Sequence, residues 1–281
     1  MQITTPIVTM IARRSWCINE YGMDAMFLLE GAHKALLIDT GTGTFNVAEL
    51  VRQLTGKPVM VVCTHGHVDH VGGIGFFDTV YLHEADFEAA RTLSAESRKG
   101  YVRIMNSMSG GLFSVTEEDV VEFDRVPELK PLKEGDIIDL GGRKIVVYET
   151  PGHTPGGLSF LDVRERMIFT GDACNGNTLL SSSDRVKPRS GVDTLLATAE
   201  KLKSLEPYYD RDYNGHIGYA ANLTCAPMPE SINDDAIRVC KGILSGEIKG
   251  EPQEAPFGGS SNHAGYGAFG VRFDPAQIYE K

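Results

Sequence analysis

The chain has 281 residues, of which 42% are hydrophobic and 23% are charged, an ordinary composition for a folded globular protein that excludes general disorder. Lys and Arg number 27 against 38 Asp and Glu, so the net charge of −11 disfavours binding to nucleic acids and to acidic membrane surfaces. This length can bury a substantial core, and no linker divides the sequence, so we predict a single domain over residues 1–281.

The first part of the chain alternates strand and helix signals. Two short apolar runs, Ala25–Glu30 and Ala35–Asp39, are separated by Gly31 and predict a hairpin. Helical spacing predicts a helix over Val47–Leu54. A fully apolar strand is predicted over Val59–Cys63, and its carboxyl end runs directly into a cluster of histidines. Another strand is predicted at Val80–His83.

Residues 84–125 have a different character. They begin with a helical pattern and then become rich in Met, Ser and Gly, which predicts a helical insertion of the kind that often forms a lid or binding loop. The stretch Ile104–Met108 is open to three interpretations: the lining of an apolar pocket, simple packing, or the contact of a homodimer.

The rest of the chain returns to strands followed by helices, which favours a layered α/β or α+β architecture. A C-terminal extension is predicted from about residue 220, with a Gly- and Pro-rich tail from Gly246. The elements predicted in this half are strands at Ile137–Leu140, Lys144–Tyr148, Leu158–Asp162, Met167–Thr170 and Ala268–Phe273, and helices at 192–206 and Pro229–Ser245.

The five cysteines are odd in number and form no CxxC pair, which favours reduced thiols over a disulfide framework. The N-terminus shows no pattern of a secretory signal, and the apolar run at Val59–Cys63 is far too short to span a bilayer. Together these features predict a cytoplasmic protein, with a mature secreted chain whose signal has been removed as the alternative. The cysteines are Cys17, Cys63, Cys174, Cys225 and Cys240.

Three of the eight histidines lie within six residues, at His65, His67 and His70, with Asp69 among them. Imidazole and carboxylate are the ligands that suit zinc, iron or manganese. Gly66 allows a sharp backbone turn, so that neighbouring side chains can converge on one point. Solvent-exposed histidines in a turn are the alternative, but their density directly after a buried strand favours a metal site.

A catalytic zinc usually takes three ligands from the protein, and this segment offers four candidates. The segment therefore indicates a second metal, with further ligands from other parts of the chain. His153, Asp172 and His216 each lie beside a glycine in a loop that follows a regular element. Loops at strand ends are where sheets present functional groups. Each of the three alone is more often an ordinary turn residue, but their order and contexts together favour ligands.

The ordered motifs HxHxDH (65–70), GH (152–153), GD (171–172) and GH (215–216) resemble those of the metallo-β-lactamase superfamily. The resemblance runs from about Ala25 to His216. It implies an α/β (α+β) fold, a four-layer αββα sandwich with two metals at one edge between the sheets.

By motif position, the resemblance implies a complete dinuclear site. Asp172 would bridge the two metals, and Asp39 resembles the buried turn acid that supports the histidine loop from outside the ligand set. The metals are expected to be two zinc ions, although Mn²⁺ or Fe²⁺ would also suit these ligands. The other ligands are His65, His67 and His153 for the first metal, and Asp69, His70 and His216 for the second.

The resemblance also narrows the choice among the branches of this superfamily. True β-lactamases lack an aspartate at the position of Asp172, and the oxygen-reducing diiron branch replaces His67 with glutamate. The nucleic-acid-processing branches add a large domain or a basic arm. The complete set is therefore similar to the glyoxalase II and lactonase side of the family, although Cys174–Asn177 and the Asn214-Gly215 pair depart from the usual pattern and leave the substrate open.

The predicted activity is hydrolysis of a small ester, thioester or lactone by a metal-bridging hydroxide, with Asp69 as the catalytic residue that orients it. A phosphodiesterase is the first alternative, for which the Arg185–Lys187–Arg189 cluster would bind phosphate. A ligand-binding or regulatory protein that keeps its metals but turns over little is the second. A mononuclear iron oxygenase is the least favoured, because both ligand sets are filled. A small-molecule substrate is the partner expected in the leading interpretation.

Four residues are predicted to contact the substrate: Cys174 and Asn175 after the bridging aspartate, Tyr219 after the last histidine, and His263 in the tail. Each has a plainer alternative. Cys174 can be a small core residue, Tyr219 can pack with its hydroxyl at the surface, and His263 can lie in a solvated loop.

Overall fold

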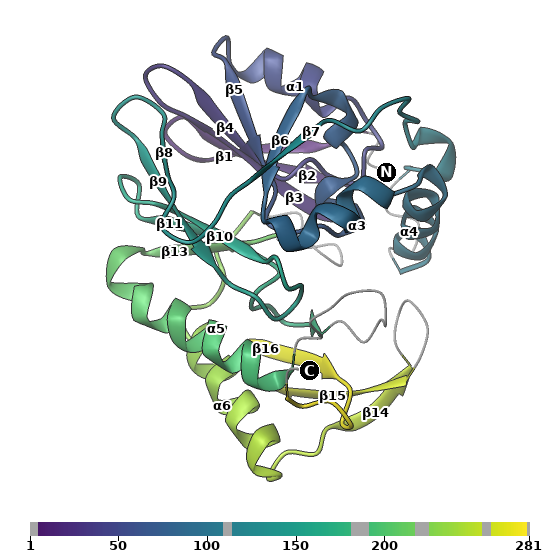
Figure 1. Cartoon of the computed structure of the whole chain (residues 1–281), viewed down its shortest axis with the longest axis vertical. Helices are drawn as coiled ribbons and strands as arrows, with labels where there is room; N and C mark the ends of the chain where they lie inside the picture. Colours follow the sequence, from purple (N-terminus) through teal and green to yellow (C-terminus); the bar gives the residue numbers. More distant parts are fainter. Residues whose placement is uncertain (1–4, 109–113, 181–190, 217–224, 255–259, 280–281) are drawn as a thin grey trace.

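Two β-sheets face each other in the middle of the protein, and helices cover their outer faces (Figure 1). The computed structural model describes residues 5–108, 114–180, 191–216, 225–254 and 260–279. The four layers confirm the predicted αββα sandwich.

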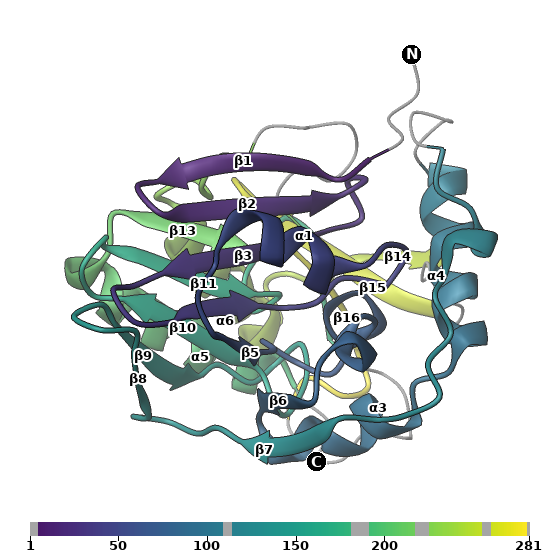
Figure 2. The ribbon, with the colours of Figure 1, turned by 90° about the horizontal axis from the view of Figure 1, so that it is seen from above.

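The first sheet has seven strands in the order β1-β2-β3-β4-β5-β6-β7. Strands β1 to β4 pair antiparallel and β4 to β7 parallel. Helix α1 lies across the outer face of this sheet (Figure 2). The bounds are β1 Ile7–Ala12, β2 Ser15–Glu20, β3 Asp24–Glu30, β4 Ala35–Ile38, α1 Val47–Leu54, β5 Val59–Val62, α2 Val68–Val71, η1 Ile74–Phe76, β6 Thr79–Leu82 and β7 Glu128–Pro131.

The second sheet has five strands in the order β13-β11-β10-β9-β8, and helices α5 and α6 pack on its outer face. Only β11 and β13 pair parallel. The bounds are β8 Ile137–Asp139, β9 Lys144–Glu149, β10 Leu158–Asp162, β11 Met167–Gly171, α5 Val192–Leu205, η4 Glu206–Tyr208, β13 Arg211–Asn214 and α6 Ile232–Ser245.

The central strands are apolar on both faces because each face packs against another layer. In β3, Phe27 and Leu29 contribute to the core between the two sheets, whereas Met26 and Leu28 pack in the cluster beneath α1. Successive side chains of a strand point to opposite faces, so a strand buried on both sides forms a continuous apolar run. The predicted hairpin at 25–39 is confirmed for this reason.

A third sheet, of four strands in the order β12-β16-β15-β14, packs against α6 and was not predicted. Of the tail after Gly246, only the strand at 268–273 was expected. The stretch around His263 was given a solvated loop as its plainer alternative, but it is β15. The bounds are β12 Thr178–Leu179, β14 Glu251–Glu254, β15 Ser260–Tyr266 and β16 Phe269–Phe273.

The segment predicted as a helical insertion contains η2 Glu84–Asp86, α3 Phe87–Thr92, α4 Ala95–Met108 and η3 Glu117–Asp119. Helix α4 stands at one flank of the molecule (Figure 2). Its residues Tyr101, Val102 and Met105 pack with Tyr21 and Met23 in a small cluster of their own. This packing places α4 beside the turn between β2 and β3.

The prediction that all five cysteines are reduced thiols is wrong, because Cys17 and Cys225 form a disulfide. These residues are 208 positions apart and meet only through the fold, so neither spacing nor the odd count indicated the pair. Cys63, Cys174 and Cys240 are free and buried. Disulfides are rare in the cytosol, so the cysteine argument for a cytoplasmic location loses its basis. Within the described ranges, no helix is both long and apolar enough to cross a membrane.

The stability of the folded protein is predicted to depend on pH through Asp212, which lies on β13. Its Oδ1 accepts a hydrogen bond of 2.7 Å from the Thr170 hydroxyl, but its Oδ2 is buried with no hydrogen-bond partner among the described residues. Burial raises the pKa of this carboxyl from 3.8 to about 7. The folded protein therefore binds this proton more tightly than the unfolded chain does. The contribution of Asp212 to stability is complete below pH 3.8 and is lost as the pH rises through about 7.

We expect Asp212→Asn to flatten the pH dependence of the unfolding free energy across this window. The slope removed should approach ~1.4 kcal/mol per pH unit, the value for one proton. Urea unfolding of wild type and variant at several pH values between 4 and 8 measures the difference. Parallel curves for the two proteins would contradict the assignment to Asp212.

Candidate metal centre

The seven predicted ligands follow the ends of strands from both sheets. His65 and His67 lie in the loop after β5, and α2 follows immediately with Asp69 and His70. From the second sheet, the loops after β9, β11 and β13 carry His153, Asp172 and His216. The structure thus brings together residues that are up to 151 positions apart, counting from 65 to 216.

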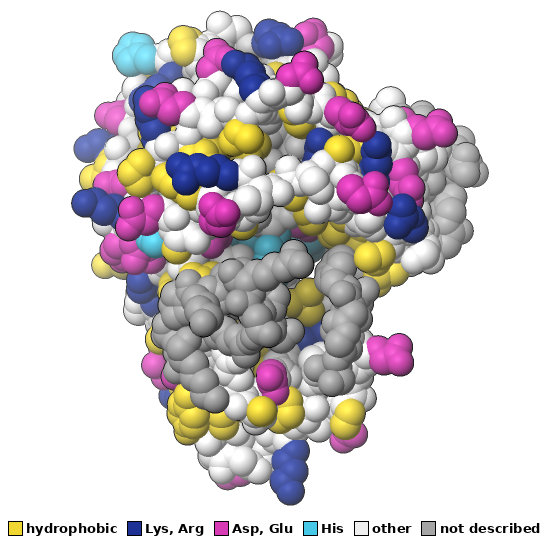
Figure 3. Space-filling view, turned by 45° about the vertical axis from the view of Figure 1, so that its right-hand side comes forward, with side chains coloured by type: hydrophobic (Ala, Val, Ile, Leu, Met, Phe, Trp, Pro, Cys, Tyr) yellow, Lys and Arg dark blue, Asp and Glu magenta, His cyan; other side chains and the backbone are white. Residues whose placement is uncertain are grey.

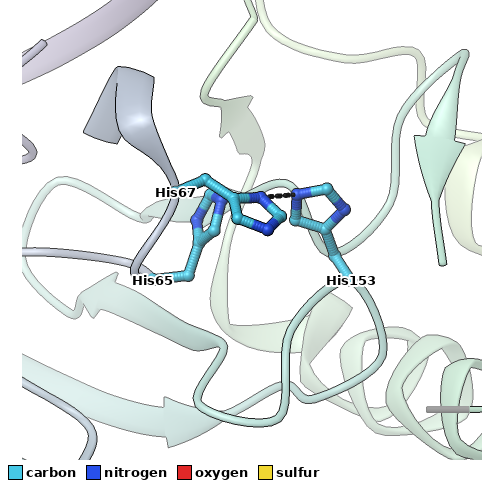
Figure 4. A group of neighbouring side chains, drawn as sticks. All are labelled: His65, His67 and His153. Carbon is cyan, nitrogen blue, oxygen red and sulfur yellow. Dashed lines mark hydrogen bonds between the residues drawn. The ribbon is translucent and has the colours of Figure 1, made fainter. Parts of the chain in front are cut away.

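The first group consists of His65, His67 and His153, whose ligand atoms all lie within 4.8 Å of one another. Figure 4 shows their three rings turned toward one another, with 2.8 Å between His67 Nδ1 and His153 Nε2. The second group consists of Asp69, His70 and His216, on the same criterion.

Asp172 lies between these two groups. Its carboxylate oxygens are 3.4 Å from His153 Nε2, 3.6 Å from His70 Nε2 and 2.9 Å from His216 Nε2. One side chain therefore contacts ligand candidates of both groups.

Hydrogen bonds on the far side of each ring orient three of the histidines. The Nδ1 atoms lie 2.6 Å from Leu179 O for His153, 2.9 Å from Met23 O for His216, and 2.9 Å from Asp39 Oδ2 for His70. A ring that donates from Nδ1 to an oxygen keeps the lone pair of Nε2 for a metal.

The centre also contains buried polar atoms that the described residues leave without hydrogen bonds: His65 Nε2, His70 Nε2 and Asp172 Oδ1. Such atoms are costly to bury without partners, and cations bound at the two groups would satisfy all three. The donor set of nitrogen and carboxylate oxygen therefore fits two divalent metals of the zinc type.

Charge differs between the two sides of the centre. Burial lowers the pKa of His70, but the surrounding carboxylates, led by Asp69, outweigh burial and raise it to about 10. Burial likewise opposes charge on His216, and Asp172 raises its pKa to about 9. For His153, burial and a neighbouring imidazole lower the pKa to about 4. One side thus has excess carboxylate charge, which attracts cations, and the other has neutral imidazole, the form that ligates metals.

Asp39 supports the histidine loop from behind. Its Oδ1 accepts a hydrogen bond of 2.7 Å from the Thr64 backbone, and its Oδ2 lies 2.9 Å from both the Thr64 hydroxyl and His70 Nδ1. The residue has a φ of +64°, in the left-handed region that few residues other than glycine adopt. The structure therefore places Asp39 next to a ligand candidate and outside both groups.

Gly215 is required by the close approach of β13 to the centre. A Cβ atom at this position would lie 2.4 Å from His70 Cε1 and 2.8 Å from Asp172 Oδ1. Both atoms belong to buried side chains that cannot move away without displacing the site. The glycine before His216 therefore has a steric role, in addition to marking the motif.

Asp86 was not singled out from the sequence, although it joins the two histidine loops. Its Oδ2 accepts 2.8 Å hydrogen bonds from the backbone of Gly66 and from the hydroxyl of Thr154, and its Oδ1 accepts one of 3.0 Å from the backbone of Gly156. Asp86 is buried in the insertion. It thus holds the loop of His65 and His67 against the loop of His153.

We expect Asp86→Ala to weaken metal binding about 10- to 100-fold, the range typical of residues that support metal ligands. Zinc titration against a competing chelator measures the effect. Asp78→Ala is the matched control, because Asp78 is exposed and pairs with Arg125 at the surface. An Asp86→Ala protein with unchanged zinc affinity would refute this role.

The four predicted substrate contacts have different positions. A cavity of about 670 Å³ opens beside the histidines, and Asn175 lines it together with His67, Asp69, His153, Asp172 and His216. Cys174 instead packs in the apolar cluster with α5 and α6, and His263 borders a separate hollow on the third sheet. Tyr219 and the Arg185–Lys187–Arg189 cluster lie outside the described residues. Figure 3 shows histidine side chains recessed between the two halves of this face, with hydrophobic side chains beside them.

Tyr101 is the contact in the site that sequence reasoning missed. It projects from α4 into the cavity, and its hydroxyl donates a hydrogen bond of 2.7 Å to Asp69 Oδ2. Its position on a helix far from the motifs gave no signal in the sequence. A pocket lining was one of the three interpretations of Ile104–Met108, a stretch that does not include Tyr101, and its Met105 and Met108 do line the cavity.

Residues 22–209 match the sequence pattern of the metallo-β-lactamase superfamily. The chain belongs to this superfamily. Among curated relatives in the superfamily, the human acyl-coenzyme A thioesterase MBLAC2 is 27% identical over 205 residues, which cover 64% of this chain and 67% of that protein. The chicken MBLAC2 is 26% identical over 201 residues and is matched over 66% of its length, so the chain spans about two thirds of these relatives.

Other members are less informative about activity. A probable metallo-hydrolase of Streptococcus pyogenes is 24% identical over 203 residues, covering 71% of this chain and 81% of that protein. The sec-alkylsulfatase Pisa1 from a Pseudomonas species has a TM-score of 0.61 at 15% identity, covering 88% of this chain and 46% of that one. The DIM-1 metallo-β-lactamase has a TM-score of 0.56 at 12% identity, and the match covers 84% of this chain and 97% of that one. These solved structures show the shared fold, and the relatives named as thioesterase and metallo-hydrolase support hydrolase activity.

Proposed function

We propose that this protein is a dinuclear, zinc-type hydrolase of small acyl thioesters and related esters or lactones. The observation that carries the proposal is the position of Asp172, which contacts ligand candidates of both groups at distances of 2.9–3.6 Å. The metals would be held by His65, His67 and His153 on one side and by Asp69, His70 and His216 on the other, with Asp172 shared.

Metals bound there would supply Lewis acidity toward a carbonyl oxygen and lower the pKa of a water molecule to near neutrality. The protein's own contribution centres on Asp69. Burial opposes its charge, but the imidazoles of His70 and His216 lower its pKa, so its carboxylate is ionised and able to orient a water molecule and accept its proton. Tyr101 fixes one of the carboxylate oxygens through its hydrogen bond of 2.7 Å.

Two observations support a thioester or ester over a phosphodiester. The MBLAC2 relatives are named as acyl-coenzyme A thioesterases. None of the described residues that line the cavity is Arg or Lys, the side chains that recognise phosphate. The apolar residues of the lining suit an acyl group instead.

A substrate panel tests the proposal. Zinc- and manganese-loaded protein is assayed on a short acyl thioester, a lactone, a phosphodiester and a β-lactam. We expect hydrolysis of the thioester or the lactone at a rate proportional to bound metal. Turnover of the phosphodiester or the β-lactam alone would refute the proposal, and full metal occupancy with no turnover would favour the ligand-binding alternative.

We expect Tyr101→Phe to lower kcat on an acetyl thioester about 10- to 100-fold, with little change in KM or zinc content. The lost hydrogen bond to a charged group, worth about 1.5–3 kcal/mol, positions Asp69 rather than binding substrate. Steady-state kinetics separate the two constants. Tyr208→Phe is the control, because Tyr208 is exposed on η4. An unchanged kcat, or a rise in KM alone, would show that Tyr101 does not act through Asp69.

A further inference from the structure

Helix α4 presents three side chains to the cavity along one face. Tyr101, Met105 and Met108 are spaced by four and three residues, the spacing that aligns side chains on a helix, and all three line the cavity that contains the metal centre. Tyr101 contacts Asp69 at the inner end. The two methionines follow along the helix, over about 10 Å at 1.5 Å per residue.

The wall beyond the metal centre is apolar. Met105 is 8% exposed and Met108 is 54% exposed, so the methionine face changes from buried to open along α4. Methionine side chains are flexible and adapt to ligands of varied shape. The other apolar residues that line the same cavity are Val68, Leu179 and Met228.

Away from α4, the lining also contains three amide side chains, which lie near Leu179 and Met228 and are already engaged in hydrogen bonds. Asn175 Oδ1 accepts a hydrogen bond of 2.7 Å from the backbone of Asn177, and Asn177 Oδ1 accepts one of 3.0 Å from Arg272. Asn214 Oδ1 accepts one of 2.7 Å from the backbone of His216. A hydrocarbon chain placed over these side chains would cover amide groups, whereas on the α4 side it would cover apolar surface.

We propose that the substrate's acyl chain lies along the Tyr101–Met105–Met108 face of α4, with its carbonyl group at Asp69 and Asp172, and that this face sets the preference for chain length. The inference rests on the proposed hydrolase function and adds its substrate class, a medium-chain acyl group. Met105 and Met108 are specificity residues in this arrangement, since neither contacts the reacting atoms.

The test uses S-acyl thioesters of N-acetylcysteamine, with acetyl, butanoyl, hexanoyl and octanoyl groups, so that only the chain varies. We expect kcat/KM of the zinc-loaded protein to rise about fourfold per added methylene, the factor that corresponds to ~0.8 kcal/mol per buried CH₂. Met108→Glu should lower the octanoyl-to-acetyl ratio at least tenfold, and Met108→Leu should preserve it. Ser107→Glu is the matched control, because Ser107 is exposed beside Met108 and outside the cavity lining.

A second measurement does not depend on turnover. The S-octyl thioether of N-acetylcysteamine, which cannot be hydrolysed, should bind the wild type and Ser107→Glu more tightly than Met108→Glu in calorimetric titration. Hydrolysis of all four thioesters at equal rates, or equal binding of the thioether by all variants, would overturn the inference and leave the proposed function standing. Tight, Met108-dependent thioether binding without hydrolysis of any thioester, ester or lactone would overturn the proposed function and retain the acyl-chain site.

Discussion

Replacement of Asp172 with Asn is expected to lower kcat/KM about a hundredfold to a thousandfold, because polarisation by a correctly held metal is worth several kcal/mol and each 1.36 kcal/mol is tenfold. The loss follows from the position of this carboxylate, whose oxygens lie 3.4 Å from His153 and 2.9 Å from His216. Asparagine preserves the shape but removes the negative charge that two cations would share. Elemental analysis should show the bound metal falling from two ions per chain to one or none.

A matched variant separates this effect from general loss of charge. Asp210→Asn makes the same chemical change at an exposed residue that pairs with Arg166, so activity and metal content should be unchanged. Asp172→Asn protein that retains two metals and wild-type turnover would refute the dinuclear assignment. Loss of turnover with both metals retained would instead show that Asp172 acts on the substrate and is not needed to hold the metals.

The parts of the site that the sequence revealed are those encoded within a few residues. His65, His67, Asp69 and His70 are neighbours in the chain, and they follow directly after a strand that is apolar on both faces. His153 and Asp172 likewise follow strands whose buried runs are visible in the sequence. The ordered motifs carried the resemblance to the superfamily, and the sandwich was expected only because that resemblance implies it.

The residues that the sequence did not reveal act across long separations. Tyr101 reaches Asp69 from a helix of the insertion, and Asp86 joins two loops that are far apart in the chain. The disulfide of Cys17 and Cys225 spans 208 positions. Such contacts depend on how the layers are stacked, and residue type alone does not indicate that arrangement.

Short or polar strands were missed for a different reason. Strand β13, Arg211–Asn214, lies between α5 and His216 although its four residues show no apolar alternation. Strand β14 is fully exposed, and β15 is rich in Ser and Gly. These strands are held by neighbours in the sheet, so their own side chains give no hydrophobic pattern.

Arg143 joins the two central sheets and is the clearest case of stability that depends on a distant partner. Its side chain is 2% exposed, and its Nε lies 2.7 Å from Asp162 Oδ2 within the second sheet. Its other nitrogens donate hydrogen bonds to the backbone oxygens of Arg14 and Glu30 and to the hydroxyl of Ser15, which lie along the first sheet. One guanidinium thus satisfies a buried carboxylate and bridges the layers.

We expect Arg143→Met to destabilise the protein by about 3–5 kcal/mol, because it leaves the buried carboxylate of Asp162 without its cation. Arg164→Met, which breaks a surface pair with Glu165, should cost no more than ~1 kcal/mol. Urea unfolding of the zinc-loaded proteins measures both. The double variant Arg143→Met with Asp162→Asn should recover part of the loss, since no charge is then left buried. Equal costs for the two arginine variants would show that Arg143 contributes packing alone, and the link between the sheets would then rest on the apolar core between them.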